Sequence, residues 1–278
     1  MSAAEQTHTV DARGGSPERF GYSWDRFFDL SPDQEEQFAR WTAPIELTTG
    51  WDGLRFLDAG CGMGRNAYWP MKHGARSGVA ADLDARSLAR ARHNLSAFPA
   101  VEVIEASIYE LPFRDEFDVA FSIGVIHHLE HPDLAIAQLI QAVKPGGRVL
   151  IWVYGYENLE LFVHVLNPLR RMLFSRLPLP LVRLLALAPA GLLWALLRAG
   201  FQPIAYLRQL RRFSFAHLHS IVFDQMLPAT ARYWRREEAL ALLADPRLER
   251  VEIVWVNECS WTVTGVKRDD PPDRAEAM

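Results

Sequence analysis

The stretch 54-LRFLDAGCGMGR-65 decides the fold of this chain. An apolar run typical of a buried strand leads into a turn with three glycines, Gly60, Gly62 and Gly64. Glycines at this spacing allow a tight turn and let a ligand approach the backbone closely. Asp82 lies twenty residues after Gly62, at the end of the next apolar run, where a carboxylate can hydrogen-bond a ribose diol. The stretch therefore predicts a strand, loop and helix that bind a nucleotide.

Short apolar runs alternate with helical stretches on the carboxyl side of this loop. The runs are 54–57, 77–81, 101–104, 119–121 and 148–153. This alternation predicts βαβ units around a mostly parallel sheet. Two later runs, 251–256 and 261–266, are too close together for a crossover helix, so we expect them to pair antiparallel.

The glycine loop lacks the spacing of the dinucleotide pattern G-x-G-x-x-G and instead resembles motif I, D-x-G-x-G-x-G, of class I S-adenosylmethionine-dependent methyltransferases. Three further stretches resemble motifs of this family, in the family's order: 111-LPF-113, 117-FDVAFSIGVIHHL-129 and 143-VKPGGR-148. The resemblance is to the type 11, ubiquinone-biosynthesis-like branch and covers residues 54–155. It implies an α/β, Rossmann-like sheet of seven strands with an antiparallel terminal strand. An NAD-dependent oxidoreductase is an alternative that the glycine spacing disfavours.

The resemblance also implies which residues bind S-adenosylmethionine, whose product is S-adenosylhomocysteine. Asp58 would orient the loop or the amino group, Asp82 would hold the ribose, and Ser107 and Ile108 would border adenine. Ser107 stands where the family commonly has Asp, so its hydrogen bond to adenine carries no charge. The full set is Asp58, Gly60, Cys61, Gly62, Gly64, Asp82, Leu83, Ser107, Ile108, Ser122 and Gly124.

Candidate catalytic side chains follow the fourth and fifth strands, at the sheet edge where open parallel sheets bind ligands. His128 stands where the family usually has a histidine, and Tyr154 ends the fifth apolar run. A base is needed only if the acceptor is protonated near neutral pH. The remaining candidates for substrate contact are Tyr22, Trp24, His127 and Tyr156, for which packing is an equally good explanation and, for His127, the better one. Cys61 and Cys259 have no metal-ligand spacing, so no metal site is expected.

The charge of the chain is unevenly distributed. Its net charge is −4, but the window 161–236 contains eleven arginines, no lysine and one acidic residue, Asp224, for a net charge of +10. The longest charge-free run there, 184–197, has fourteen residues and includes Pro189. A membrane-spanning helix needs about twenty residues, so we expect none.

Arginines in this window suggest a surface that contacts a partner. Arg208, Arg211 and Arg212 share one side of an expected helix whose other side is apolar, a pattern typical of helices that lie on an anionic membrane. A lid over the substrate, a dimer contact and an ordinary core-facing helix with a solvated basic side fit the same pattern. Asp224, the lone acid, is expected to pair with a nearby arginine.

The sequence predicts six segments. They are a disordered tail (1–17), a helical lid (18–45), the cofactor-binding core (46–155), a helical basic and apolar insertion that covers the substrate (156–236), a return helix with the final strand pair (237–268) and a second tail (269–278). No apolar leader is found in the first seventeen residues, so we expect a cytoplasmic protein, peripheral to the inner face of the membrane if the insertion binds lipid.

The expected activity is methyl transfer to a small-molecule or lipid- or sugar-linked acceptor, with O-methylation favoured. C-methylation of a quinone-like or aromatic acceptor and a non-catalytic binding module are the alternatives. A nucleic-acid acceptor is disfavoured because 122-SIGV-125 lacks the N/D-P-P-Y/F pattern of base-amino methyltransferases.

Overall fold

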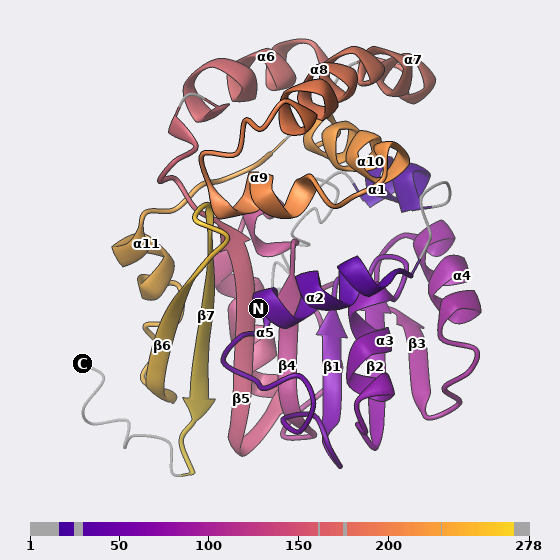
Figure 1. Cartoon of the computed structure of the whole chain (residues 1–278). Helices are drawn as coiled ribbons and strands as arrows, with labels where there is room; N and C mark the ends of the chain where they lie inside the picture. The colour runs from indigo at the N-terminus through magenta and orange to yellow at the C-terminus, as the bar shows by residue number, and fades with distance from the viewer. Residues whose placement is uncertain (1–16, 25–29, 161, 175–176, 229, 270–278) are drawn as a thin grey trace, which may run out of the picture.

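The computed structural model describes residues 17–24, 30–160, 162–174, 177–228 and 230–269, whose strands form one seven-stranded sheet in the order β3-β2-β1-β4-β5-β7-β6 (Figure 1). The strands are β1 (Arg55–Ala59), β2 (Ser77–Asp82), β3 (Val101–Glu105), β4 (Phe117–Ile123), β5 (Val143–Tyr154), β6 (Leu248–Val256) and β7 (Ser260–Lys267). The first five strands pair in parallel, and β7 runs antiparallel to both β5 and β6. The predicted fold class is confirmed.

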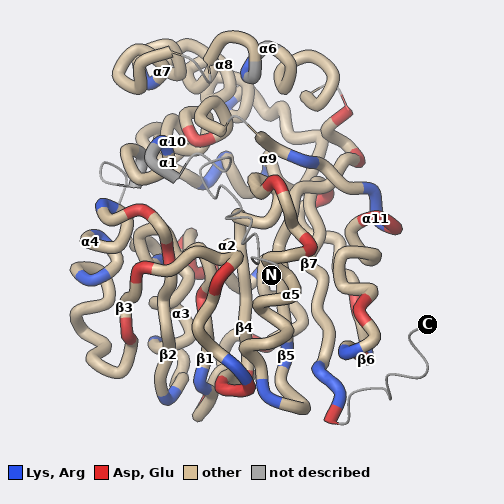
Figure 2. Tube along the Cα trace, turned by 180° about the vertical axis from the view of Figure 1, so that it is seen from behind, with Lys and Arg blue, Asp and Glu red and all other residues tan. Residues whose placement is uncertain are grey.

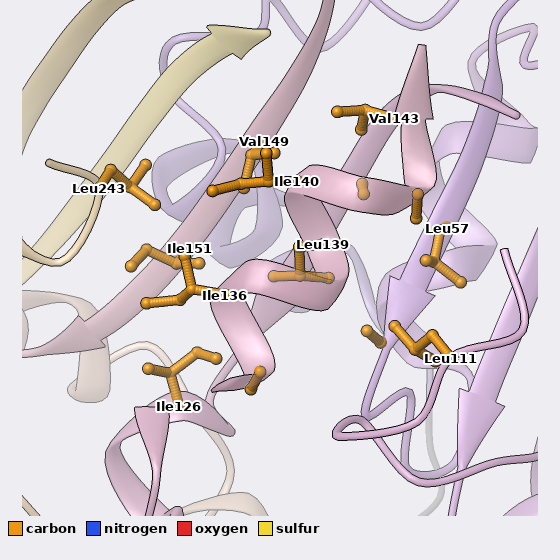
Figure 3. Close-up of a cluster of buried hydrophobic side chains, with 14 of the residues drawn as sticks. Leu57, Leu111, Ile126, Ile136, Leu139, Ile140, Val143, Val149, Ile151 and Leu243 are labelled. Atoms are coloured by element: carbon orange, nitrogen blue, oxygen red, sulfur yellow. The ribbon is translucent and has the colours of Figure 1, made fainter. Parts of the chain in front are cut away.

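Residues alternate along each strand between two hydrophobic layers, as expected for a sheet buried on both sides. On one side, β1 and β5 pack against α5 (Pro132–Ala142). Figure 3 shows this contact with Leu57, Ile136, Leu139, Ile140, Val149 and Ile151. The opposite side is aromatic, with Phe56 and Phe121 of the sheet against Phe38 of α2 (Pro32–Trp41) and Trp51. Helices α3 (Arg65–Lys72) and α4 (Ala85–Asn94) complete this second layer.

Residues 156–236, which we call the cap, lie over the carboxyl ends of the parallel strands (Figure 1). Their helices are a π-helical turn (Phe162–Leu166), α6 (Asn167–Met172), α7 (Leu179–Leu185), α8 (Leu187–Arg198), α9 (Ala205–Leu210) and α10 (Phe215–Met226). The cap has small hydrophobic clusters of its own, centred on Val182 with Phe223 and on Leu210 with Phe213. Helix α1 (Pro17–Trp24) packs between α10 and α4. Helix α11 (Arg236–Ala241) returns the chain to the sheet.

Helices α7 and α8 form a longer apolar stretch than the fourteen-residue charge-free run suggested. Leu179–Arg198 is a 20-residue helical stretch that is long and apolar enough to cross a membrane by length and composition, and 17% of its most apolar window is buried inside the protein. Arg183 ends the charge-free run on its amino-terminal side, but it lies within α7 and the helical stretch extends past it. Pro189 is the third residue of α8, where a backbone N–H has no partner within the helix, so the proline is tolerated. The apolar face of this stretch therefore lies largely on the surface.

Candidate cofactor and acceptor site

The glycine loop between β1 and α3 requires glycine for both conformation and space. Gly60, Gly62 and Gly64 have φ angles of +82°, +53° and +77°, in the left-handed region. A Cβ atom on Gly60 would lie 2.5 Å from the Val125 side chain, and one on Gly64 would lie 2.8 Å from Leu95. Any side chain at these positions would force the loop away from its neighbours.

Asp82, the last residue of β2, ties the loop to the neighbouring strand. Its Oδ2 accepts a hydrogen bond from the Gly62 N–H at 2.8 Å, and its Oδ1 accepts one from the Asp84 N–H at 3.0 Å. Burial raises the pKa of Asp82 from its ordinary value. Two backbone N–H groups thus fix the orientation of the Asp82 carboxylate. A carboxylate that binds ribose hydroxyls needs such a fixed orientation.

Asp58 is a fully buried carboxylate at the end of β1. Its oxygens accept no side-chain hydrogen bond among the described residues, and the backbone N–H of Ala67 is the donor that acts on its charge. Burial, with the charge of Asp82, raises the pKa of Asp58 well above its usual range, and the Arg65 guanidinium opposes this only in part. An ionised carboxylate is therefore costly to hold at this position, and the predicted contact of Asp58 with the amino group of S-adenosylmethionine stays a prediction.

A cavity of about 1200 Å³ runs from the glycine loop to the cap. Eight of the predicted cofactor residues line it: Gly60, Cys61, Gly62, Asp82, Leu83, Ser107, Ile108 and Gly124. Its volume exceeds the roughly 300–1,000 Å³ typical of a single small-molecule site. The cavity therefore has room for the cofactor together with a second molecule.

The other three predicted cofactor residues lie outside this lining and support the loop instead. Asp58 lies behind it, and Gly64 begins α3. Ser122 is fully buried, and its Oγ donates a hydrogen bond to the Ala59 carbonyl at 2.8 Å, which joins the ends of β4 and β1.

Both predicted catalytic residues line the cavity where it meets the cap. The Nδ1–H of His128 donates to the Thr230 carbonyl at 2.8 Å, which leaves Nε2 as an acceptor in the neutral ring. Burial lowers the pKa of His128 to about 4, so the ring is neutral at pH 7 and a weak base. Tyr154 accepts a hydrogen bond from the Gln225 amide at 2.8 Å, and burial raises its pKa. These groups are suited to orienting an acceptor rather than to removing a tightly held proton.

The structure does not bring to the cavity the three remaining substrate candidates whose side chains it describes, Tyr22, His127 and Tyr156. His127 is fully buried and stacks on Tyr154 with ring centroids 3.6 Å apart, and burial lowers its pKa well below the usual value. The Tyr156 hydroxyl bonds His164 at 2.8 Å, and its ring packs under Arg235, away from the lining. Tyr22 packs against Phe223. The Trp24 side chain lies outside the described part of the chain, as do residues 1–16 and 270–278 of the predicted tails.

Of the three arginines expected on one side of a helix, only Arg208 lies on α9, because the helix ends at Leu210. Two of the three have acidic partners within the chain. Arg208 pairs with Glu258 at 3.3 Å, and Arg212 pairs with Asp33 at 3.3 Å and also with Glu36 of α2. Arg211 is exposed. These pairs attach the cap to the body because the cap is basic and the body acidic.

Four residues that the sequence did not single out line the cavity: Phe20, Arg65, Arg170 and Tyr233. Phe20, from α1, packs against the His128 ring with centroids 5.0 Å apart. Arg65 directly follows motif I, so its position in the sequence could have indicated that it lies near the cofactor. Burial lowers the pKa of Arg65, while the negative charges of Asp224 and Asp58 oppose this shift. Asp224, the one acidic residue of the basic window, therefore stabilises the charge of an arginine in the core. Arg170 is one of eleven arginines in the window, and nothing in the sequence distinguishes it.

Comparisons with known proteins all point to one family, the methyltransferases. A family model described as "Methyltransferase domain" matches residues 57–151. A malonyl-[acyl-carrier protein] O-methyltransferase from Erwinia billingiae is 30% identical over 213 residues, which cover 69% of this chain and 79% of that protein. A tRNA U34 carboxymethyltransferase from Pseudoalteromonas atlantica is 30% identical over 107 residues, 33% of its length, and an uncharacterised Synechococcus protein matches over 25% of its length.

Solved structures share the fold. The magnesium protoporphyrin IX methyltransferase of Synechocystis PCC 6803, solved with bound S-adenosylhomocysteine, superposes with a TM-score of 0.54 at 14% identity, over 92% of this chain and 100% of that one. Several curated relatives thus share little more than the core, whereas the Erwinia protein also aligns over much of the remaining chain.

The Asp82 geometry predicts a specific loss of cofactor affinity. The Asp82→Asn variant should bind S-adenosylmethionine about tenfold to a hundredfold more weakly in calorimetric titration, because charge-assisted hydrogen bonds are lost. Glu105→Gln is the matched control, since Glu105 pairs with Asp82 in the sheet but is exposed and lies outside the lining. Unchanged affinity in Asp82→Asn would exclude the ribose role.

The Asp58 carboxylate predicts a stability that depends on pH. A carboxyl group whose pKa is raised by folding stabilises the folded state below its ordinary pKa of about 4 and loses this contribution as pH rises. Without ligand, the Tm of Asp58→Asn should exceed that of the wild type by about 2–4 °C or more at pH 8. The difference should shrink toward pH 4. Asp52→Asn, at an exposed position, is the control, and a difference that is constant with pH would contradict the assignment.

Proposed function

Because this chain belongs to the class I S-adenosylmethionine-dependent methyltransferases, we propose that it methylates an oxygen atom of a small-molecule or lipid- or sugar-linked acceptor. When bound, S-adenosylmethionine supplies a methyl group on a sulfonium, which is transferred by in-line displacement. The observation that carries the proposal is the single cavity that joins the glycine loop to a cap with an apolar outer surface. The protein's contribution is to align the acceptor and to exclude water.

Oxygen is favoured over carbon by the groups at the cap end of the cavity. A carbon acid must lose a proton, which needs a base of matched pKa. His128, with a pKa of about 4, and Tyr154, with a raised pKa, are poorly matched to that task near pH 7. An oxygen acceptor that is already ionised, or that needs only a hydrogen bond to His128 Nε2, suits them better. The name of the long-aligning Erwinia relative, an O-methyltransferase, supports the same choice.

The surface of the cap supports an acceptor in, or attached to, a membrane. Among the described residues, all exposed large hydrophobic side chains except Leu134 lie between positions 165 and 215. Leu184 and Leu192 are 62% and 64% exposed, and both belong to the apolar stretch of α7 and α8. Leu185 and Leu193 of the same stretch line the cavity. A molecule held in the lipid layer could therefore reach the cavity along a continuous apolar surface.

Charge supports an anionic bilayer as the partner of this surface. The sequence has no Asp or Glu between residues 161 and 223, while Arg183 and Arg198 are exposed on α7 and α8. Figure 2 shows acidic segments along the body and none along α7 and α8. A surface of leucines bordered by arginines, without acids, suits the interface of a membrane with negatively charged headgroups. We propose that the protein lies at the cytoplasmic face of such a membrane.

The acceptor class is tested by following transferred label. Incubation with methyl-labelled S-adenosylmethionine and a total lipid extract should give label in the organic phase, and total RNA in a parallel reaction should give none. Mild alkali separates the bonds formed, because it releases label from a methyl ester and leaves an ether or a C-methyl group intact. Label only in RNA would refute the proposal, and alkali-stable label on a ring carbon would refute its oxygen assignment.

Membrane attachment is tested by sedimentation with vesicles of phosphatidylglycerol and phosphatidylcholine. The wild type should sediment with them, and the Leu184→Ser/Leu192→Ser double variant should lose about tenfold or more of its binding, since apolar burial in the interface is lost. Leu134→Ser, an exposed leucine on α5 of the core, should bind as the wild type does. A wild type that fails to sediment, or a double variant that only converts a dimer to a monomer, would exclude the membrane surface.

A further inference from the structure

Arg170 of α6 is a buried cation at the cap end of the cavity. Its side chain is 3% exposed and lines the cavity together with His128, Tyr154 and Tyr233. Its positive charge lowers the pKa values of both His127 and His128, so its field reaches the candidate catalytic groups. The guanidinium therefore lies beside the place where an acceptor would bind.

No carboxylate of the described residues forms an ion pair with Arg170. The guanidinium donates hydrogen bonds to neutral acceptors, the Asn167 side chain and the Gln225 carbonyl, the latter at 3.5 Å. Its Nε–H has no hydrogen-bond partner within the described part of the chain. Burial of a charge without an opposite charge is costly, and a buried donor without an acceptor adds to the cost. Both costs are relieved when an anion binds beside the guanidinium.

A second unpartnered donor lies next to Arg170. The Tyr233 hydroxyl is buried beside the Arg170 guanidinium, which can donate to its oxygen, and no acceptor for its O–H proton is found among the described residues. Burial raises the pKa of Tyr233, and the adjacent Arg170 opposes that shift, so the hydroxyl stays protonated near neutral pH and can donate. The Tyr233 ring stacks on Tyr154 with centroids 5.5 Å apart, which holds it in place. One N–H and one O–H are thus available together at this end of the cavity.

We infer that Arg170 and Tyr233 form a binding subsite for an anionic group of the acceptor, a carboxylate or a phosphate. The inference deepens the proposed function and rests on it for the identity of the bound molecule as the acceptor. The remainder of the cavity lining is largely apolar, with Phe162, Leu166, Phe174 and Leu193 from the cap. The subsite therefore takes a molecule with one anionic end and an apolar body.

This subsite also explains why no strong base is needed nearby. A carboxylate or phosphate is ionised at neutral pH and carries its lone pairs without losing a proton at the site. If the bound anion is itself methylated, one of its oxygens forms the new bond to carbon as the methyl group leaves sulfur, and no proton moves. If it is only an anchor, it fixes the position of a neighbouring hydroxyl.

The test uses three amphiphiles of equal chain length, octanoate, octyl phosphate and octanol, titrated calorimetrically into protein saturated with S-adenosylhomocysteine. Octanoate or octyl phosphate should bind about tenfold or more tightly than octanol. The stronger of the two anions identifies the headgroup. Arg170→Met should abolish the preference, Arg170→Lys should retain part of it, and Tyr233→Phe should weaken it. Arg236→Met, which removes an exposed arginine at the start of α11, outside the lining and outside the apolar surface of α7 and α8, should leave it unchanged.

Equal binding of the three compounds, or a preference that survives in Arg170→Met, would overturn the subsite. Because Arg170→Met could fail to fold, its Tm and its affinity for S-adenosylhomocysteine are measured first. Tyr233→Phe provides a second, independent test of the preference for an anion over octanol. The outcome is separable from that of the proposed function: methylation of a lipid extract without an anion preference refutes only the subsite, whereas an anion preference without methylation refutes only the choice of acceptor.

Discussion

The pair of hydrogen bonds that Asp82 accepts from Gly62 and Asp84 is the interaction on which the site depends. It joins the loop after β1 to the end of β2, so two strand ends share one rigid edge. The glycines have left-handed backbone angles that this edge holds in place, and Ser122 adds the end of β4 through the Ala59 carbonyl. The cavity begins at this edge, and the cap lies over its other end.

The uneven charge of the chain has a structural counterpart in the way its two parts meet. Arg208 and Arg212 of the cap pair with Glu258, Asp33 and Glu36 of the body, and these pairs are partly exposed. Other cap arginines have different surroundings: Arg170 is buried at the cavity, while Arg183 and Arg198 face outward beside exposed leucines. Arginines of one window that has almost no acidic residues thus have three different surroundings. Some attach the cap to the body, one lies at the ligand cavity, and others lie on the outer surface of the cap.

Much of the core could be predicted because its signals are local. The glycine loop and Asp82 lie within thirty residues of one another. The alternating runs predict the parallel strands, and the short spacing between the last two runs predicts their antiparallel pairing. The cap could not be predicted in the same way. Arg212 meets Glu36 across 176 positions, and Phe20 of α1 contacts His128 in the middle of the chain. No periodicity in the sequence encodes such contacts. Arg170 differs from Arg183 and Arg198 by its burial, and its hydrogen bond to the Gln225 carbonyl places it beside α10, which the sequence does not reveal.

The small, separate hydrophobic clusters of the cap have a dynamic consequence. The sheet and its two layers share large continuous clusters, whereas the cap depends on four-residue centres around Val182 and Leu210. A region with few buried apolar contacts opens at a lower free energy than the rest of the fold. Amide hydrogens of α7 and α8 are therefore expected to exchange with solvent long before those of β1 and β4. Acceptor entry then requires only this partial opening, with the cofactor edge of the sheet left intact.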